Sequence, residues 1–181
     1  VSILANLGRP TDDEMQSIAK LNGVGLLRTE FLFLDHSEPP SIEQQVNVYS
    51  QVARQAAGEA TIRTLDLGGD KFPLFLERHL EMNPNRGSRG LRFSLTAGEQ
   101  LFRDQIRALL HTAQQFPIKI MFPMVVGIDD LVAAKTIVAD IATDMGVTSI
   151  PPIGVLVETP AAVLLTEFWI MLILWVSALT I

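Results

Sequence analysis

Charged side chains follow three short apolar runs of this sequence. Arg28 comes directly after GVGLL, Arg63 ends the run beginning ATI, and Glu158 follows IGVLV. In folds built from parallel strands, residues at the carboxyl ends of the strands surround the bound ligand. Guanidinium groups bind phosphate or carboxylate oxygens in pairs, and a carboxylate can hold a divalent cation. The sequence therefore predicts a site for a phosphorylated or carboxylated ligand together with a metal ion.

The segment NPNRGSRGLRF supplies further arginines, Arg86, Arg89 and Arg92, within seven residues. If it is extended, alternation points some of them, but not all, toward the site. Arginine is costly to bury without an anionic partner, so converging arginines indicate an anionic ligand. Structural ion pairs with nearby acidic residues are an equally good interpretation. The acidic candidates are Glu30, Asp66 and Asp70.

Two other groups of residues could bind ligands but lack the required spacing. The segment Gly68–Lys71 resembles a phosphate loop only in composition, so we predict a turn after a strand. The three histidines, His36, His79 and His111, form no metal-binding pattern. We expect them on the surface or on helix faces.

Repeated βα units must position these side chains. Short apolar and β-branched runs alternate with amphipathic patterns, which is typical of a parallel sheet with helices packed on it. The predicted strands are Ser2–Leu7, Val24–Arg28, Ala60–Leu67, Arg89–Leu95, Ile118–Met124 and Ile153–Val157. This pattern leaves both a doubly wound sheet and most of an α/β barrel open. The 181 residues are fewer than the roughly 200 to 250 of a complete barrel.

Capping residues predict where several helices begin and end. A Ser or Thr followed three residues later by Glu or Gln forms a capping box. The predicted boxes pair Thr11 with Glu14, Ser41 with Gln44 and Thr96 with Glu99. Thr159 before Pro160 predicts another helix start. Gly58 and Gly146 are predicted helix ends with positive φ.

Composition excludes several classes of function. The chain has 14 basic and 20 acidic side chains, a net charge of −6 and no cysteine. An acidic balance argues against nucleic acid as a partner. Without cysteine there is no disulfide, no thiolate metal site and no thiol nucleophile. The first residues lack the basic start of a signal peptide, so we expect a cytoplasmic protein.

The end of the chain differs sharply from the rest. Residues 161–181 carry one charged side chain, Glu167, and residues 168–181 carry none. Because a membrane helix needs about 20 apolar residues, we do not expect a membrane span. We predict one domain over residues 1–167, followed by an aberrant hydrophobic tail at 168–181. Such an apolar tail is expected to promote association between chains.

Four blocks in order, GVGLLRTEFLF, TIRTLDLGGDK, KIMFPMV and IGVLVETPAA, carry a family resemblance. Together they resemble the phosphoenolpyruvate-binding barrel of the phosphoenolpyruvate-utilising transferases. RTEFLF, the SEPPSIEQQVNVY segment and LDLGGDK make the chain most similar to the Enzyme I family of the bacterial sugar phosphotransferase system. Pyruvate phosphate dikinase and phosphoenolpyruvate synthase are the near alternatives. The resemblance covers residues 1–167 and implies an incomplete TIM-type (β/α)8 barrel with about six of the eight strands.

The resemblance also implies roles for individual residues. Arg28, Arg63 and Arg89 match arginines that hold the phosphate of phosphoenolpyruvate, and Glu158 matches a ligand of Mg2+. In that family the phosphoryl group passes to a histidine on a separate mobile domain, and the remaining enolate is protonated to pyruvate. A histidine-phosphocarrier protein is the implied partner. The barrel domain is also implied to form a homodimer.

The sequence departs from the family pattern at several points, and three of them bear on catalysis. It lacks the GTNDL segment with the second magnesium ligand, the cysteine that protonates the enolate, and the context of the phosphorylated histidine. We therefore expect no catalytic residue in this chain and little or no independent activity, as in a truncated or frame-shifted fragment. A non-catalytic binding or dimerisation module is one alternative. A membrane-tethered protein is another.

Overall fold

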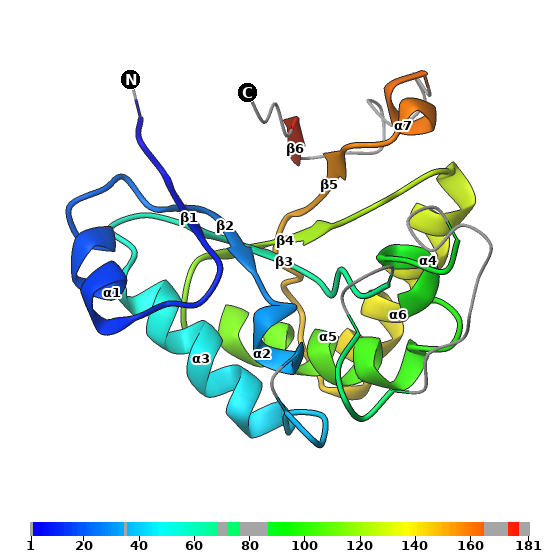
Figure 1. Cartoon of the computed structure of the whole chain (residues 1–181), viewed down its shortest axis with the longest axis horizontal. Helices are drawn as coiled ribbons and strands as arrows, with labels where there is room; N and C mark the ends of the chain where they lie inside the picture. Colours follow the sequence, from blue (N-terminus) through cyan, green and yellow to red (C-terminus); the bar gives the residue numbers. More distant parts are fainter. Residues whose placement is uncertain (1, 35, 69–71, 77–86, 165–173, 178–181) are drawn as a thin grey trace.

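The computed structural model of the chain describes residues 2–34, 36–68, 72–76, 87–164 and 174–177. Its centre is a parallel sheet of six strands (Figure 1). The strands are β1 (Ala5–Leu7), β2 (Val24–Arg28), β3 (Ala60–Arg63), β4 (Ile118–Phe122), β5 (Ile153–Val157) and β6 (Leu174–Ser177). Side chains are described for β1 to β5, and only the backbone for β6.

Each strand pairs in parallel with the next strand along the chain. Ile62 of β3 lies opposite Ile120 of β4, and Gly154 of β5 lies opposite Leu174 of β6. The order therefore contains no reversal of the kind that defines a doubly wound sheet. Within the described residues, β1 and β6 do not pair with each other, so the sheet is singly wound and open.

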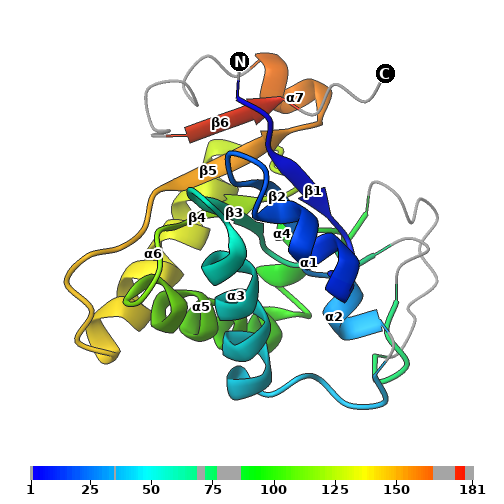
Figure 2. The same ribbon diagram turned by 90° about the vertical axis from the view of Figure 1, so that its left-hand side faces the viewer.

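The helices are α1 (Asp12–Ile18), α2 (Phe31–Leu34), α3 (Ile42–Gln55), α4 (Leu91–Ser94), α5 (Glu99–Ala113), α6 (Ile128–Asp144) and α7 (Pro160–Leu164). The longer helices follow the strand order, with α1 against α3, α3 against α5 and α5 against α6. Figures 1 and 2 show this helix layer on one side of the sheet. In the described part of the chain, no helix has both the length and the hydropathy that a membrane span requires.

The main hydrophobic core lies between the helix layer and the sheet. Tyr49 and Val52 of α3 and Phe102 and Ile106 of α5 are fully buried. Their spacing of three or four residues places them on one face of each helix. They belong to the same apolar cluster as Ile62 of β3. This packing holds the strands, and therefore the residues at their ends, in fixed positions.

The predicted strand Arg89–Leu95 is wrong, because part of it forms the short helix α4. β3 pairs directly with β4, so the sheet has no place for another strand between them. Gly90 precedes α4 with a φ of 57°, and both Leu91 and Phe93 are buried. A short apolar alternation does not distinguish a strand from a buried helical turn. The other five predicted strands are present, whereas β6 lies within the segment predicted to be an aberrant tail.

Three of the four predicted helix starts are confirmed. Both groups of the capping box bond in two cases, Thr11 with Glu14 and Ser41 with Gln44. The hydroxyl of Thr159 accepts the N–H of Ala162 at 3.1 Å. The box at Thr96 is wrong, because α5 begins after Gly98. The Thr96 hydroxyl instead donates to the carbonyl of Arg92 at 2.7 Å.

The two glycines predicted at helix ends differ. Gly146, directly after the last turn of α6, has a φ of 66° as predicted. Gly58 does not have a positive φ, so that prediction is wrong. A Cβ atom at Gly58 would lie 2.5 Å from the carbonyl oxygen of Asn22. Glycine is therefore required there by a close approach of two backbone segments.

Candidate functional site

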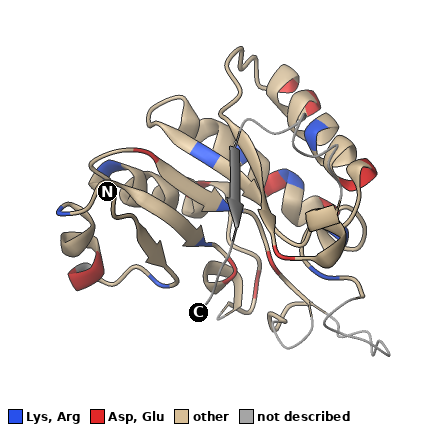
Figure 3. Cartoon of the chain, turned by 90° about the horizontal axis from the view of Figure 1, so that it is seen from above, with Lys and Arg blue, Asp and Glu red and all other residues tan. Residues whose placement is uncertain are grey.

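Charged residues lie just beyond the carboxyl ends of the central strands (Figure 3). Arg28 ends β2, Arg63 ends β3, and Glu158 directly follows β5. Arg28 and Arg63 are register partners on adjacent strands, so their side chains leave the same face of the sheet. Arg89 reaches the same region by bonding Asp66, three residues beyond Arg63. The structure thus places all four predicted site residues at one end of the sheet.

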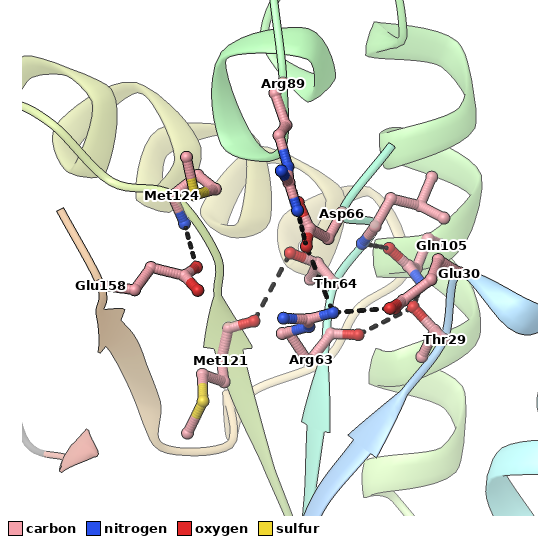
Figure 4. Close-up of polar contacts among 11 residues, drawn as sticks. Thr29, Glu30, Arg63, Thr64, Asp66, Arg89, Gln105, Met121, Met124 and Glu158 are labelled. Carbon is pink, nitrogen blue, oxygen red and sulfur yellow. Dashed lines mark hydrogen bonds and ion pairs between the residues drawn. The ribbon is translucent and has the colours of Figure 1, made fainter. Parts of the chain in front are cut away.

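Arg63 and Arg89 are connected through the carboxylate of Asp66 (Figure 4). Arg63 Nη2 donates to Glu30 Oε1 at 2.7 Å and lies 3.3 Å from Asp66 Oδ2. Arg89 donates to Asp66 with two nitrogens, Nε at 3.0 Å and Nη2 at 3.2 Å. The side chains of Glu30 and Asp66 are only 0% and 2% exposed. Carboxylates buried this deeply need cationic partners. The structural ion-pair interpretation is therefore correct for Arg63 and Arg89.

These ion pairs do not exhaust the hydrogen-bonding capacity of Arg63. Its Nε atom is buried and has no hydrogen-bond partner among the described residues. The two carboxylates hold the guanidinium group through one nitrogen, Nη2. An arginine held in this way is preorganised for an anion, because little side-chain entropy remains to be lost on binding. Structural ion pairing and ligand binding are therefore compatible at this residue.

Glu158 extends from the end of β5 toward the ion-paired group (Figure 4). Its Oε1 accepts the backbone N–H of Met124 at 2.8 Å. Although part of the side chain is open to solvent, loss of water from its surroundings raises the pKa of Glu158. The Met124 N–H lowers this pKa, Asp66 raises it, and Arg63 and Arg89 lower it. Glu158 therefore lies within electrostatic reach of the ion-paired arginines.

Arg28 has a different environment from the other two arginines. Its guanidinium carbon lies 5.3 Å from the ring centroid of Phe31, and the guanidinium carbon of Arg9 lies 6.0 Å from the same centroid. Arg28 lines a cavity of about 260 Å³ together with Gly8 and Arg9. Its Nε atom is buried without a hydrogen-bond partner among the described residues. Among the described residues, no carboxylate forms an ion pair with Arg28, in contrast to Arg63 and Arg89.

At the strand ends, Glu158 offers one carboxylate to a metal ion, which is fewer ligands than a site built by protein alone requires. The described residues contain no group of three or more His, Asp or Glu side chains suited to a metal. Mg2+ is commonly held by one or two protein carboxylates, with substrate phosphate and water as its other ligands. Glu158 can supply one such carboxylate beside the arginines, whereas Asp66 is engaged by Arg63 and Arg89.

Some other residues singled out in the sequence are not described by the structure, and two histidines lie on the surface. The Gly69–Lys71 part of the predicted turn, Arg86 and His79 lie outside the described residues. His36 and His111 are exposed, as predicted. The described part of the predicted ligand site is therefore built from arginines and carboxylates.

Sequence reasoning missed two residues that shape the site. Gln105 is fully buried on α5, where its side-chain oxygen accepts the N–H of Leu65 at 2.9 Å. A polar residue on the apolar face of a helix was the available signal, because buried polar groups must find partners. Met124 has a φ of 53°, which is rare for a residue with a side chain. Nothing in the local sequence indicates that conformation.

Comparison with known proteins places these features in a family. The chain matches the family described as PEP-utilising enzyme, PEP-binding domain, over residues 1–178. It is 41% identical over 165 residues to the phosphoenolpyruvate-protein phosphotransferase of Mycoplasma pneumoniae, covering 91% of this chain and 29% of that protein. The protein of the same name from Enterococcus faecalis is 39% identical over 176 residues, or 92% of this chain and 30% of the relative.

The multiphosphoryl transfer protein of Rhodobacter capsulatus is also similar, with 37% identity over 166 residues. The aligned part is 91% of this chain and 20% of that protein. The chain thus spans less than a third of the length of each of these three relatives. Because the family match extends over nearly all of its residues, the chain belongs to the phosphoenolpyruvate-utilising enzymes and corresponds to their phosphoenolpyruvate-binding domain.

Proposed function

We propose that this chain is the substrate-binding part of a phosphoenolpyruvate-protein phosphotransferase of the Enzyme I type. The main supporting observation is that Arg63, Arg89 and Glu158 lie close together at the strand ends. Arg28 lies at the end of the adjacent strand, β2. Phosphoenolpyruvate carries a phosphate and a carboxylate, both of which guanidinium groups bind well. Relatives named phosphoenolpyruvate-protein phosphotransferases support a protein as the phosphoryl acceptor.

The proposed architecture is an incomplete α/β barrel. Its support is the singly wound strand order with the helix layer on one side, which is how the wall of such a barrel is built. In a barrel of this kind the substrate lies at the carboxyl ends of the strands. The arginines and Glu158 occupy that end of the sheet.

In the proposed reaction the bond between phosphorus and the enol oxygen breaks, the enolate of pyruvate leaves with the electron pair, and phosphorus bonds to a histidine nitrogen of another domain. Arg63 and Arg89 would contact the phosphoryl oxygens and offset the charge that develops on them. Arg28 would turn from Phe31 to the same group. Glu158 would hold Mg2+, which would supply positive charge beside the substrate. Because the chain contains no cysteine, the proposal assigns it substrate binding and not pyruvate formation.

The proposed setting follows from the resemblance and the relatives' names. A histidine-phosphocarrier protein is the proposed partner, a second copy of the chain is the proposed dimer partner, and the cytoplasm is the proposed location. A non-catalytic binding module would retain the same ligand. The two possibilities are separated by whether the 181-residue chain forms any product.

Calorimetric titration with phosphoenolpyruvate and Mg2+ tests the binding proposal. We expect weak binding by the unmodified chain and a loss of at least about tenfold in Arg28→Ala, because that substitution removes an uncompensated guanidinium group. Arg103→Ala is the matched control. Arg103 pairs with Glu99 on α5 and both side chains are partly exposed, so its loss should leave the affinity unchanged.

The proposal fails if the unmodified chain does not bind, or if Arg28→Ala binds as tightly as the unmodified chain. A second measurement mixes the chain with phosphoenolpyruvate, Mg2+ and a histidine-phosphocarrier protein and follows pyruvate. We expect no pyruvate above background. Its formation would show that the chain catalyses the complete reaction by itself.

A further inference from the structure

Buried polar side chains connect the helix layer to the strand ends. Gln105 on α5 donates through Nε2 to the hydroxyl of Thr29 at 3.0 Å and to that of Tyr49 at 2.9 Å. Its Oε1 accepts the N–H of Leu65 at 2.9 Å. Tyr49 in turn donates to Oε1 of Gln45 at 3.2 Å. Figure 4 shows Gln105 reaching Thr29 from the helix side.

The groups at the ends of this network fix the direction of its hydrogen bonds. The N–H of Leu65 can only donate, so Gln105 must direct its oxygen to Leu65 and its nitrogen to the hydroxyls. The carbonyl of Arg63 can only accept, and Thr29 donates to it at 2.8 Å. Burial raises the pKa of Tyr49, although the Gln105 bond lowers it, so the phenol keeps its proton. One arrangement of hydrogens therefore satisfies all of these groups.

Gln105 joins the two segments that carry the site. Thr29 follows Arg28 in the segment after β2, and Leu65 precedes Asp66 in the segment after β3. The side chains of both Thr29 and Gln105 are buried, so water cannot replace a bond that is lost. One amide group thus bonds to both segments, in addition to the β2–β3 pairing and the bond from Thr29 to the Arg63 carbonyl.

We propose that Gln105 is a positioning residue that fixes the segment after β2 against the segment after β3. Through them it sets the spacing of the Arg28 and Arg63 guanidinium groups for an anionic ligand. Gln105 does not touch the ligand. The effect on ligand binding rests on the proposed function, whereas the tie between the two segments does not.

Two buried substitutions in the full chain separate positioning from general stability. Gln105→Met keeps the length of the side chain and removes its bonds to Leu65, Thr29 and Tyr49. Tyr49→Phe removes the two bonds of the phenol hydroxyl, to Gln105 and to Gln45. It keeps the bonds of Gln105 to Leu65 and Thr29. Both variants lose buried hydrogen bonds, so both are expected to be less stable. Urea unfolding measures the free energy of unfolding of each variant, so that their stabilities can be compared.

Amide hydrogen exchange at Leu65 is the first readout, and phosphoenolpyruvate affinity with Mg2+ is the second. We expect Gln105→Met to raise the exchange rate at Leu65 about tenfold and to weaken phosphoenolpyruvate binding about tenfold. A tenfold change corresponds to about 1.4 kcal/mol. Tyr49→Phe should change either value by no more than about twofold. If Gln105→Met does not fold, Thr29→Val takes its place in the binding measurement. It removes the bonds of the hydroxyl to both Gln105 and the Arg63 carbonyl, and Thr29→Ser, which keeps the hydroxyl, is expected to restore binding.

Equal effects of Gln105→Met and Tyr49→Phe at the same stability would overturn the proposal. Unchanged exchange at Leu65 in Gln105→Met would also overturn it. If the unmodified chain fails to bind phosphoenolpyruvate, the proposed function is lost, and the exchange rate at Leu65 alone decides whether Gln105 holds the two segments together. For Thr29→Val, binding as tight as in Thr29→Ser would count against the proposal.

Discussion

Arg63 and Glu158 lie near each other but differ in how their charges are balanced. Arg63 is nearly buried between Glu30 and Asp66, which compensate its charge directly. Glu158 has a backbone N–H as its hydrogen-bonding partner and loses hydration, so its charged form is disfavoured. A carboxylate in this state gains from a cation that arrives with a ligand. The raised pKa of Glu158 therefore agrees with the metal-binding role that we propose for it.

Glu158→Gln is expected to stabilise the chain near neutral pH. Because the pKa of Glu158 is raised by folding, the folded chain keeps this proton to a higher pH than the unfolded chain does. The stability contributed by Glu158 therefore falls as the pH rises from the ordinary carboxyl pKa through the raised value. Urea unfolding should show an advantage of Glu158→Gln at about pH 7 that disappears at about pH 3.5.

Glu38→Gln, in an exposed loop before α3, is the control for the loss of a charge. It should change the free energy of unfolding little at either pH. An advantage of Glu158→Gln that is equal at both pH values would contradict desolvation of Glu158 as the cause.

At the scale of elements, short connections bring the ends of strands and helices into contact. Gly90 directly precedes α4 with a φ of 57°. A Cβ atom there would lie 2.7 Å from Cβ of Met124 and 3.4 Å from Oδ1 of Asp66. Glycine is therefore needed for both its conformation and its size. The start of α4 packs in this way against the residue whose N–H binds Glu158.

Gly90→Ala is expected to destabilise the chain more than Gly146→Ala. Both glycines have positive φ values, 57° and 66°, and alanine costs about 1 to 2 kcal/mol where the backbone is left-handed helical. Gly90 combines its φ with a ψ of −127°, outside that region, so alanine is strained there even more. A Cβ atom at Gly146 would meet nothing within 4 Å. At Gly90 the overlap with Met124 should add about 1 to 3 kcal/mol. Urea unfolding of the two variants measures the difference, and equal losses would contradict the prediction.

At the scale of the whole molecule, the sheet continues into the last part of the chain. The sequence alone predicts residues 168–181 to be an aberrant apolar tail. In the structure the backbone of residues 174–177 forms β6 and pairs with β5 from Gly154 to Val157. The family match also extends to residue 178. This part of the chain covers an edge of β5 that would otherwise present unpaired N–H and carbonyl groups.

A chain ending at Leu164 is expected to self-associate more than the full chain. Its β5 edge would be open to pairing with another molecule. Light scattering coupled to size-exclusion chromatography, over a range of concentrations, compares the masses of the two forms. Greater association of the full chain would favour the prediction from the sequence, in which the apolar tail is the source of association.

The sequence by itself determined the local features of this protein. Ser41 and Gln44 indicate the start of a helix. The apolar run before Arg63 indicates a strand with a charge at its end. Both patterns depend on residues close together in the chain. The family blocks predicted Arg28, Arg63, Arg89 and Glu158 as site residues. Their location at one end of the sheet agrees with that prediction, and their roles in binding stay predictions.

Only the tertiary structure decided which groups meet. Arg63 reaches Glu30 across 33 positions of the sequence, and Gln105 reaches Thr29 across 76. The turn before α4 and the left-handed φ of Met124 likewise depend on strands and helices that pack against them. Sequence patterns report periodicity over a few neighbouring residues, whereas these contacts require the strand register and the packing of distant elements. Local patterns therefore predicted the strand ends, and packing selected the partners at those ends.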